Sequence, residues 1–498
     1  MSSGLSYDPN IEVPLLATDN IINLDKTNLD IKLNQLETLI LGSGNIYELQ
    51  TSPEYSQRID KIEAVFISIF DPLKGNEIYY NYPQSYNLEN VEYLSLPSGL
   101  HKIFNDIVYF KLGNNFGACI YQRLPASSNR FKVRGYEMRS IGLITNNYLT
   151  LNIRIQQLMN SVKLDLPLDQ LSEELTTFYQ LPPTLSNSSD PINNDSIYNS
   201  PRLSPSLQSL KVLNPLSQLQ QIIYLFGAQW SVLWKFIILK KRILVYAEPP
   251  LQFPCTLVWN LSFLADIIAD LFNSDPFEIL FNVGVNELDK LQKLESYIAV
   301  TSDRLILEKT GCHDLIIKFE DDNLNLPPTL QSNPRDSNLL VLNKNDLETY
   351  KQLLTSLQSK EEYLSDSEAE VDLMKKFVNF WYYKSEKLIG DLDLFINNFH
   401  TRSTALTLPT ANNAWSKPIK VGGLDLNNFG LHGYLDAPFV NQLISQYFSA
   451  NYSIVVRGSY WKYQFLDDVS NNKRLAVVSS LFILSILGFT SLLILEFV

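Results

Sequence analysis

The side chains with the clearest potential for chemistry are serines that lie in polar segments. Ser365 and Ser367 lie in the run SKEEYLSDSEAEVD, where acidic residues follow both serines, the pattern that acidophilic kinases favour. Ser200 and Ser204 each precede a proline and so match the pattern of proline-directed kinases. The chemistry in both places would be phosphorylation, which adds about −1.5 to −2 charges at pH 7. Both segments are more simply explained as solvated linkers without modification.

Part of the acidic run also resembles a docking motif. Glu362–Glu368 reads EYLSDSE, which is similar to the phosphorylation-dependent acidic motif that binds the ER receptors called VAP proteins. Leu364 and Asp366 depart from that pattern. The resemblance implies an ER receptor as a partner of this segment.

Motifs of the common catalytic sites are absent from the sequence. The chain contains no GxxxxGK[ST] phosphate loop, no GxSxG elbow and no HExxH metal motif. Its histidines and cysteines are not paired at metal-ligand spacing; they are His101, His313, His400, His432, Cys119, Cys255 and Cys312. We therefore expect no catalytic residue, no cofactor and no metal site, and a protein that acts by binding.

Composition narrows the class of protein further. Hydrophobic residues make up 45% of the chain and aromatic residues 12%, which supports sizeable cores in two or three domains. The formal net charge of −13 is spread along the chain and disfavours non-specific binding to nucleic acid. The scattered cysteines indicate a reducing compartment and no disulfide framework.

The most apolar segment of the chain is its end. Leu475–Leu495 carries no charge and no proline, and as a helix it would span roughly 31 Å, close to the thickness of a bilayer core. Lys473 and Arg474 precede it, and basic residues favour the cytoplasmic side. We expect a single-pass tail anchor with the N-terminus in the cytosol. A buried core helix is the alternative interpretation.

Two blocks of regular structure must position any functional surface. In the first, Val65–Phe70 and Glu77–Tyr82 are β-branched and aromatic runs that predict strands. Asp106–Leu112 and Phe116–Arg123 flank Gly113-Asn114-Asn115 and predict a β-hairpin.

The second block alternates helical and strand patterns, which is typical of an α/β fold. Helical spacing occurs at Gln218–Leu239, Leu261–Phe272, Lys344–Leu357 and Val371–Ile396, and apolar strand runs at Ile243–Ala247, Ile279–Val283, Tyr297–Val300 and Leu315–Phe319. Glu320–Asn338 is polar and contains prolines, and we interpret it as a loop. Another helix is expected from Ala437.

Several short motifs of the first block belong together: Phe70-Asp71-Pro72, Gly75-Asn76, Ser98-Gly99-Leu100-His101, Asp106–Phe110, Phe116-Gly117 and Arg139–Gly142. With them the block resembles the upstream, longin-like part of DENN-domain proteins, closest to the LCHN branch. The stretch LFGAQWSVLWKFIILKKRILVYAEPP, residues 225–250, resembles the central DENN helix-to-strand element. Residues 415–448 resemble a C-terminal segment of fungal relatives, so the chain is similar to a fungal member with a C-terminal transmembrane anchor.

The resemblance implies an α/β (α+β) fold that contains a longin-like module, a central DENN α/β module, a helical C-terminal region and the single transmembrane helix. We place the boundaries as follows: N-terminal extension 1–55, upstream DENN (longin-like) module 56–180, disordered linker 181–212, central DENN module 213–320, polar linkers with one helix 321–370, helical C-terminal region 371–472 and tail anchor 473–498.

The best known DENN-domain proteins catalyse guanine-nucleotide exchange on Rab GTPases, so the resemblance implies a Rab-like small GTPase as partner. Exchange needs no nucleophile or metal of the exchange factor, because the factor grips the switch segments and opens the nucleotide pocket. With the terminal anchor, we expect a regulator of vesicle traffic on an endomembrane, at the ER, Golgi, endosomes or vesicles.

Two other functions stay open. A non-enzymatic tether or scaffold would recruit trafficking partners through the longin-like surface and the linkers. A GTPase-activating protein would supply an arginine finger, as some longin–DENN proteins do, and Arg130, Arg134 and Arg139 lie in the corresponding module. Basic surface residues are the plainer explanation of these arginines.

Overall fold

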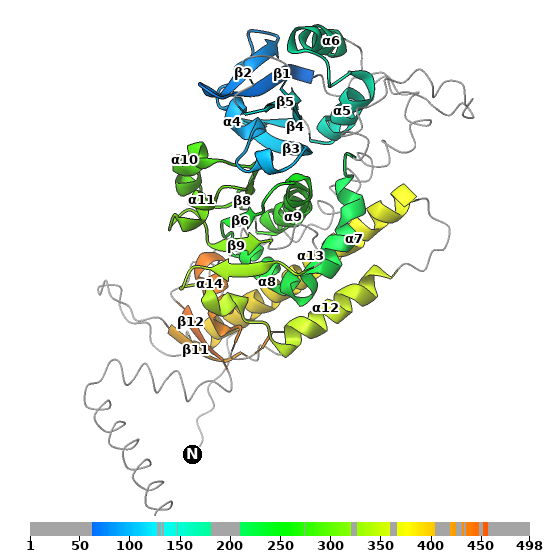
Figure 1. Ribbon diagram of the computed structural model, residues 1–498. Coiled ribbons are helices and arrows are strands. Elements are labelled where there is room, and N and C mark those ends of the chain that lie inside the picture. Colours follow the sequence, from blue (N-terminus) through cyan, green and yellow to red (C-terminus); the bar gives the residue numbers. More distant parts are fainter. Residues whose placement is uncertain are drawn as a thin grey trace, which may run out of the picture. The chain divides into compact units, whose positions relative to one another are not determined.

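The described residues of the computed structural model form two compact units, one within 1–340 and 350–386 and the other within 341–349 and 387–498 (Figure 1). The structure describes residues 62–126, 131, 134–146, 148–180, 210–272, 274–319, 326–358, 366–403, 419–424, 431–432, 435–447 and 452–456. The first unit contains a ten-stranded sheet in the order β10-β9-β6-β8-β7-β3-β4-β5-β1-β2.

The half of this sheet that comes first in the sequence is antiparallel throughout. We call it the N-terminal half-sheet; its strands are β1 (Ile62–Asp71), β2 (Gly75–Tyr82), β3 (Asn105–Leu112), β4 (Asn115–Pro125) and β5 (Tyr136–Thr145). The two predicted strands and the predicted hairpin of this block are confirmed. Gly113 adopts φ 59° in the hairpin turn, a left-handed conformation that glycine favours.

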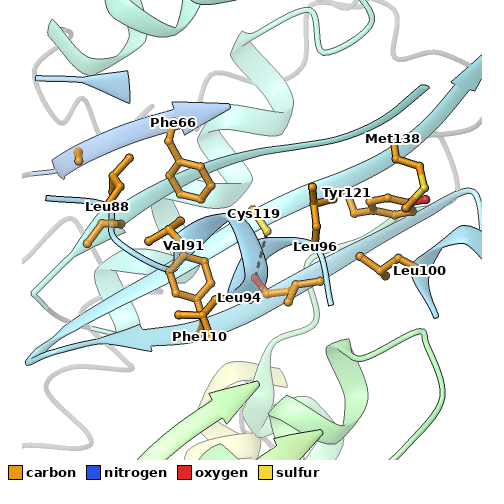
Figure 2. Packing of buried hydrophobic residues seen from close by; sticks show 13 residues of the cluster. Phe66, Leu88, Val91, Leu94, Leu96, Leu100, Phe110, Cys119, Tyr121 and Met138 are labelled. Carbon is orange, nitrogen blue, oxygen red and sulfur yellow. Dashed lines mark hydrogen bonds between the residues drawn. The ribbon is translucent and has the colours of Figure 1, made fainter. Parts of the chain in front are cut away.

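Alternation along the strands gives the N-terminal half-sheet two buried faces. On one face, α4 (Val91–Ser95) packs over Phe66, Phe110 and Tyr121 (Figure 2). On the other face lie α5 (Tyr148–Ser161) and α6 (Leu168–Gln180), which bond to tyrosines of the sheet. We call these the α4 face and the α5 face.

The C-terminal half-sheet has four parallel strands and one antiparallel edge strand. They are β6 (Ile243–Tyr246), β7 (Glu278–Asn282), β8 (Tyr297–Thr301), β9 (Leu315–Lys318) and β10 (Thr329–Ser332). The four parallel strands confirm the predicted runs. The interpretation of 320–338 as a loop was wrong at β10, because an edge strand with alternately exposed side chains carries little apolar signal.

Three buried helices cover the C-terminal half-sheet: α7 (Pro215–Phe226), α8 (Trp230–Ile238) and α9 (Gln252–Leu271). The predicted helix 218–239 is interrupted at η3 (Gly227–Gln229), where Gly227 has φ 52°. Among the described residues, Pro215–Ile238 and Gln252–Leu271 are long and apolar enough to cross a membrane, but 67% and 78% of their most apolar windows are buried. They are core helices of this unit.

Short elements complete the first unit: η1 (Leu100–Lys102), η4 (Val285–Glu287), α10 (Leu288–Lys293), α11 (Arg304–Glu308) and η5 (Ser337–Leu340). Helix α13 (Asp366–Ser403) begins in this unit and packs on α8, with the indole Nε1 of Trp234 donating to Ser385 Oγ at 2.8 Å. Helix α12 (Lys344–Leu357) confirms the prediction for 344–357.

The second unit contains strands as well as helices. Helix α14 (Ala437–Tyr447) begins where we predicted, but β11 (Ile419–Leu424) and β12 (Tyr452–Val456) form a parallel pair. The range 371–472, which we expected to be a helical region, thus contains one pair of strands in addition to helices. Each strand is short, and a short apolar run does not distinguish strand from helix by periodicity alone.

Candidate functional site

The two half-sheets meet at a junction between β3 and β7, which we call the seam. Its ladder consists of one register pair, Phe110 with Phe281. Around this pair, the carboxylate of Asp106 accepts a hydrogen bond from the Leu251 N–H at 2.6 Å. The Asn282 side-chain amide donates to the carbonyl oxygen of Leu94 at 3.0 Å. The seam thus joins segments that lie far apart in the sequence.

A half-open groove of about 360 Å³ lies along the α4 face of the seam. The N-terminal half-sheet contributes Phe70, Asn76, Ser98, Gly99, Leu100 and His101, which are residues of the motifs that carry the family resemblance. The C-terminal half-sheet contributes Val283, Gly284, Val285, Asn286, Ser302 and Asp303 from the loops after β7 and β8. Residues of three motifs therefore line one wall of a concave surface, and this surface is the candidate site.

Gly99 allows the first wall of the groove to approach the second. Its φ is 89°, and a Cβ at this position would lie 3.1 Å from Cδ of Pro249. The next residue, Leu100, is fully buried and anchors the segment in the core. Across the groove, Ser302 Oγ donates to the Ser98 carbonyl oxygen at 2.8 Å. Only glycine combines this backbone conformation with so close an approach.

Charged side chains bridge the two half-sheets beside the groove. Glu248 accepts a hydrogen bond from Lys102 Nζ at 2.6 Å and one from Arg304 Nη2 at 2.6 Å. These two hydrogen bonds hold the pKa of Glu248 below its usual value. The guanidinium of Arg304 also donates to the hydroxyl of Tyr246 at 3.1 Å. Glu248 is thus a fixed anion between cations of the two halves.

The structure describes two of the three arginines that the sequence suggested as fingers, Arg134 and Arg139. Arg134 is exposed, lines the groove and places its guanidinium carbon 4.1 Å from the centre of the Phe70 ring. Arg139 is buried and donates to the carbonyl oxygens of Leu164 and Leu166, the latter at 2.8 Å. Burial lowers the pKa of Arg139. Arg139 is therefore a core residue that is not available to a partner. Arg130 lies outside the described residues.

Apolar side chains at the groove face solvent. Tyr93 is 44% exposed and Val285 37%, and both line the groove. An exposed apolar surface with polar groups at its rim is typical of a protein–protein contact. Sequence reasoning missed both residues, because Tyr93 lies in the short helix α4 and Val285 in the single turn η4, and neither element is long enough to show a periodic signal. In the part of the chain that the structure describes, no group of three metal-binding side chains occurs.

None of the other predicted site residues has a described side chain. Ser200, Ser204, Ser365, Lys473, Arg474 and the whole of Leu475–Leu495 lie outside the described residues. Ser367 lies in the first turn of α13, and its side chain is not described. Most of the VAP-like segment Glu362–Glu368 is outside the described residues too.

The mixed α/β sheet and its helices agree with the architecture of a DENN domain. A family model described as DENN domain-containing protein 11 matches residues 65–328, more than half of the chain. The chain belongs to the DENN domain-containing protein 11 family.

Individual relatives agree with this assignment. DENN domain-containing protein 11 of Rattus norvegicus is 31% identical over 307 residues, 59% of this chain and 64% of the rat protein. The Danio rerio protein of the same name is 32% identical over 308 residues, 60% of either chain. Protein ANR2 of Saccharomyces cerevisiae is 21% identical over 342 residues, 59% of this chain and 65% of ANR2. The chain thus spans less than two thirds of the length of these relatives.

Proposed function

We propose that this protein regulates a Rab-family GTPase, acting as a guanine-nucleotide exchange factor of the LCHN-like DENN type. The observation that carries the proposal is the groove between the half-sheets, which is lined by residues of three of the DENN-like motifs: Phe70, Asn76 and Ser98 to His101. A GTPase placed there would contact both half-sheets at once. The exposed Tyr93 and Val285 provide the apolar contacts that switch segments of small GTPases require.

The chemistry of exchange fits such a surface. An exchange factor stabilises the nucleotide-free state of its GTPase by holding the switch segments away from Mg²⁺ and phosphate, so it needs a binding surface and no nucleophile. Asn286 and Asp303 at the rim add polar groups that fix the orientation of a bound segment. Exchange therefore results from tighter binding of one state of the GTPase than of the other.

The test is a panel of Rab GTPases loaded with fluorescent GDP, each mixed with the full-length protein in liposomes. We expect GDP release from at least one GTPase to rise by about tenfold or more. Unchanged release from every member of the panel would contradict exchange activity. Partners recovered equally with GDP, GTP or no nucleotide would then favour the tether or scaffold.

A GTPase-activating protein is a second candidate, because Arg134 is exposed at the same groove. An arginine finger must reach the transferring phosphate and is worth about 10³–10⁵ in rate. If Arg134 has this role, Arg134→Ala removes stimulated GTP hydrolysis, and Arg134→Lys does not restore it, because lysine lacks the planar fork. Stimulation that survives Arg134→Ala excludes the finger.

We further propose that Leu475–Leu495 anchors the protein in an endomembrane with its folded units in the cytosol. The length of this apolar run and the preceding Lys473 and Arg474 support the anchor. Imaging of the full-length protein beside a variant that ends at Asn472 tests it. The full chain is expected on an organelle and the shorter chain in the cytosol; the same membrane pattern for both contradicts the anchor.

A further inference from the structure

The seam differs from every other strand junction of the sheet in how it is bonded. Strands β3 and β4 pair along their whole length, whereas β3 and β7 share only Phe110 with Phe281. Phe281 itself has φ 54°, in the left-handed region that is costly for a residue with a Cβ, and β7 shifts register beside it. The ladder is thus weakest at the boundary between the half-sheets.

A polar group buried at the seam is incompletely bonded. Asn282 Oδ1 has no hydrogen-bond partner among the described protein atoms, although the residue is 1% exposed. Asp106 is 1% exposed, and its carboxylate is held by backbone N–H groups, among them that of Leu251. A buried polar atom without a partner destabilises the closed state, because the atom has lost its hydrogen bond to water. Opening of the site restores that hydrogen bond. The closed seam therefore carries a cost that an open seam does not.

The two faces of the seam are built differently. On the α5 face, Phe281 stacks on Tyr148 with ring centres 5.0 Å apart, and Tyr148 stacks on Trp259 at 5.7 Å. On the α4 face, single polar contacts connect the halves: Asn282 to Leu94, Ser302 to Ser98 and Lys102 to Glu248. Stacked rings tolerate small rotations, whereas hydrogen bonds weaken steeply as their distance and angle change.

We propose that the seam is a hinge: the half-sheets rotate about the Phe110–Phe281 pair and the aromatic stack, and the groove on the α4 face opens as its polar contacts break. The groove then has a closed state, in which Ser98 and Ser302 are bonded, and a wider open state. Water enters the open seam and donates a hydrogen bond to Asn282 Oδ1. This motion belongs to the chain alone and does not depend on the identity of the groove's partner.

The test is amide hydrogen exchange of the full-length protein in detergent. The Leu251 N–H bonds across the seam, whereas amides of the β4–β5 ladder bond within one half-sheet. We expect the Leu251 amide to exchange at least about tenfold faster than the β4–β5 amides, because it opens with the hinge. Equally slow exchange at both places overturns the proposal, and this comparison needs no variant.

A disulfide across the groove provides a second test of the hinge. Ser98→Cys with Ser302→Cys, oxidised, is expected to slow exchange at Leu251 by about tenfold, and reduction is expected to restore it. The matched control is Ser68→Cys with Ser95→Cys, whose hydroxyl oxygens lie 2.6 Å apart within the N-terminal half-sheet. The hinge is contradicted if the control disulfide slows exchange at Leu251 to the same extent, or if the groove disulfide does not slow it.

Discussion

Asp106 is the most informative residue for a test of the seam, because burial raises the pKa of its carboxyl group from 3.8 to about 7. Backbone N–H groups of Leu251 and Ile107 donate to the carboxylate and oppose the shift without cancelling it. The unfolded chain releases this proton near pH 4, and the folded chain keeps it until about pH 7. The folded state therefore binds more protons across this window, so the free energy of unfolding falls as pH rises through it.

The magnitude follows from the two pKa values. At about 1.4 kcal/mol per pH unit over the window, the full effect is about 4 kcal/mol, of which about 3 kcal/mol falls between pH 5 and pH 8. Asp106→Asn removes the titration and keeps an oxygen that can accept the Leu251 N–H. When pH is raised from 5 to 8, the free energy of unfolding of the variant is thus expected to rise by about 3 kcal/mol relative to that of the wild type.

The assay is urea unfolding of both full-length proteins at pH 5 and pH 8, followed by tryptophan fluorescence. Other titrating groups are shared and cancel when the change in the wild type is subtracted from the change in the variant. The exposed Asp289, changed to asparagine, is the matched control for the same change of side chain at the surface. The reasoning is refuted if the free energies of unfolding of Asp106→Asn and the wild type differ by the same amount at pH 5 and pH 8, within about 0.5 kcal/mol.

Two further substitutions test the assignments in the N-terminal half-sheet. Arg139→Ala is expected to destabilise the protein by about 3 kcal/mol or more, because the buried carboxylate of Glu137 loses its neighbouring cation. The exposed Arg134→Ala should change stability by less than about 0.5 kcal/mol, and equal urea midpoints for the two variants would contradict the placement of these arginines. Gly142→Ala should cost about 1–3 kcal/mol, because its Cβ would lie 2.4 Å from the Phe66 ring; thermal unfolding at an unchanged midpoint would contradict this packing.

Much of the fold was predictable because the strands carry strong local signals. The hairpin β3–β4 follows from two apolar runs around Gly113-Asn114, and β6 follows from an uninterrupted apolar run. Strand β5 gave no such signal, since Glu137 and Arg139 stand in it and are buried together. Charged residues in a buried strand satisfy one another or the backbone, and no sequence pattern reveals that arrangement.

The candidate site was predictable only in part. The motif residues Ser98-Gly99-Leu100-His101 pointed to a functional segment, and the structure places them in the groove. Their partners on the second wall, such as Val285 and Ser302, come from the segments that follow β7 and β8 in the other half-sheet. Pairing of β3 with β7 brings these loops close, and one register pair between distant strands has no local signature in the sequence.

The most direct test of the central claim, a groove that binds and regulates a GTPase, compares two single substitutions on a responsive Rab. Val285→Asp puts a charge on the apolar surface of the groove, whereas Leu326→Asp changes a residue that is 62% exposed and does not line it. The claim predicts that Val285→Asp slows GDP release by about tenfold or more while Leu326→Asp keeps the wild-type rate. Wild-type GDP release with Val285→Asp, in a protein that unfolds at the wild-type urea midpoint, would contradict it.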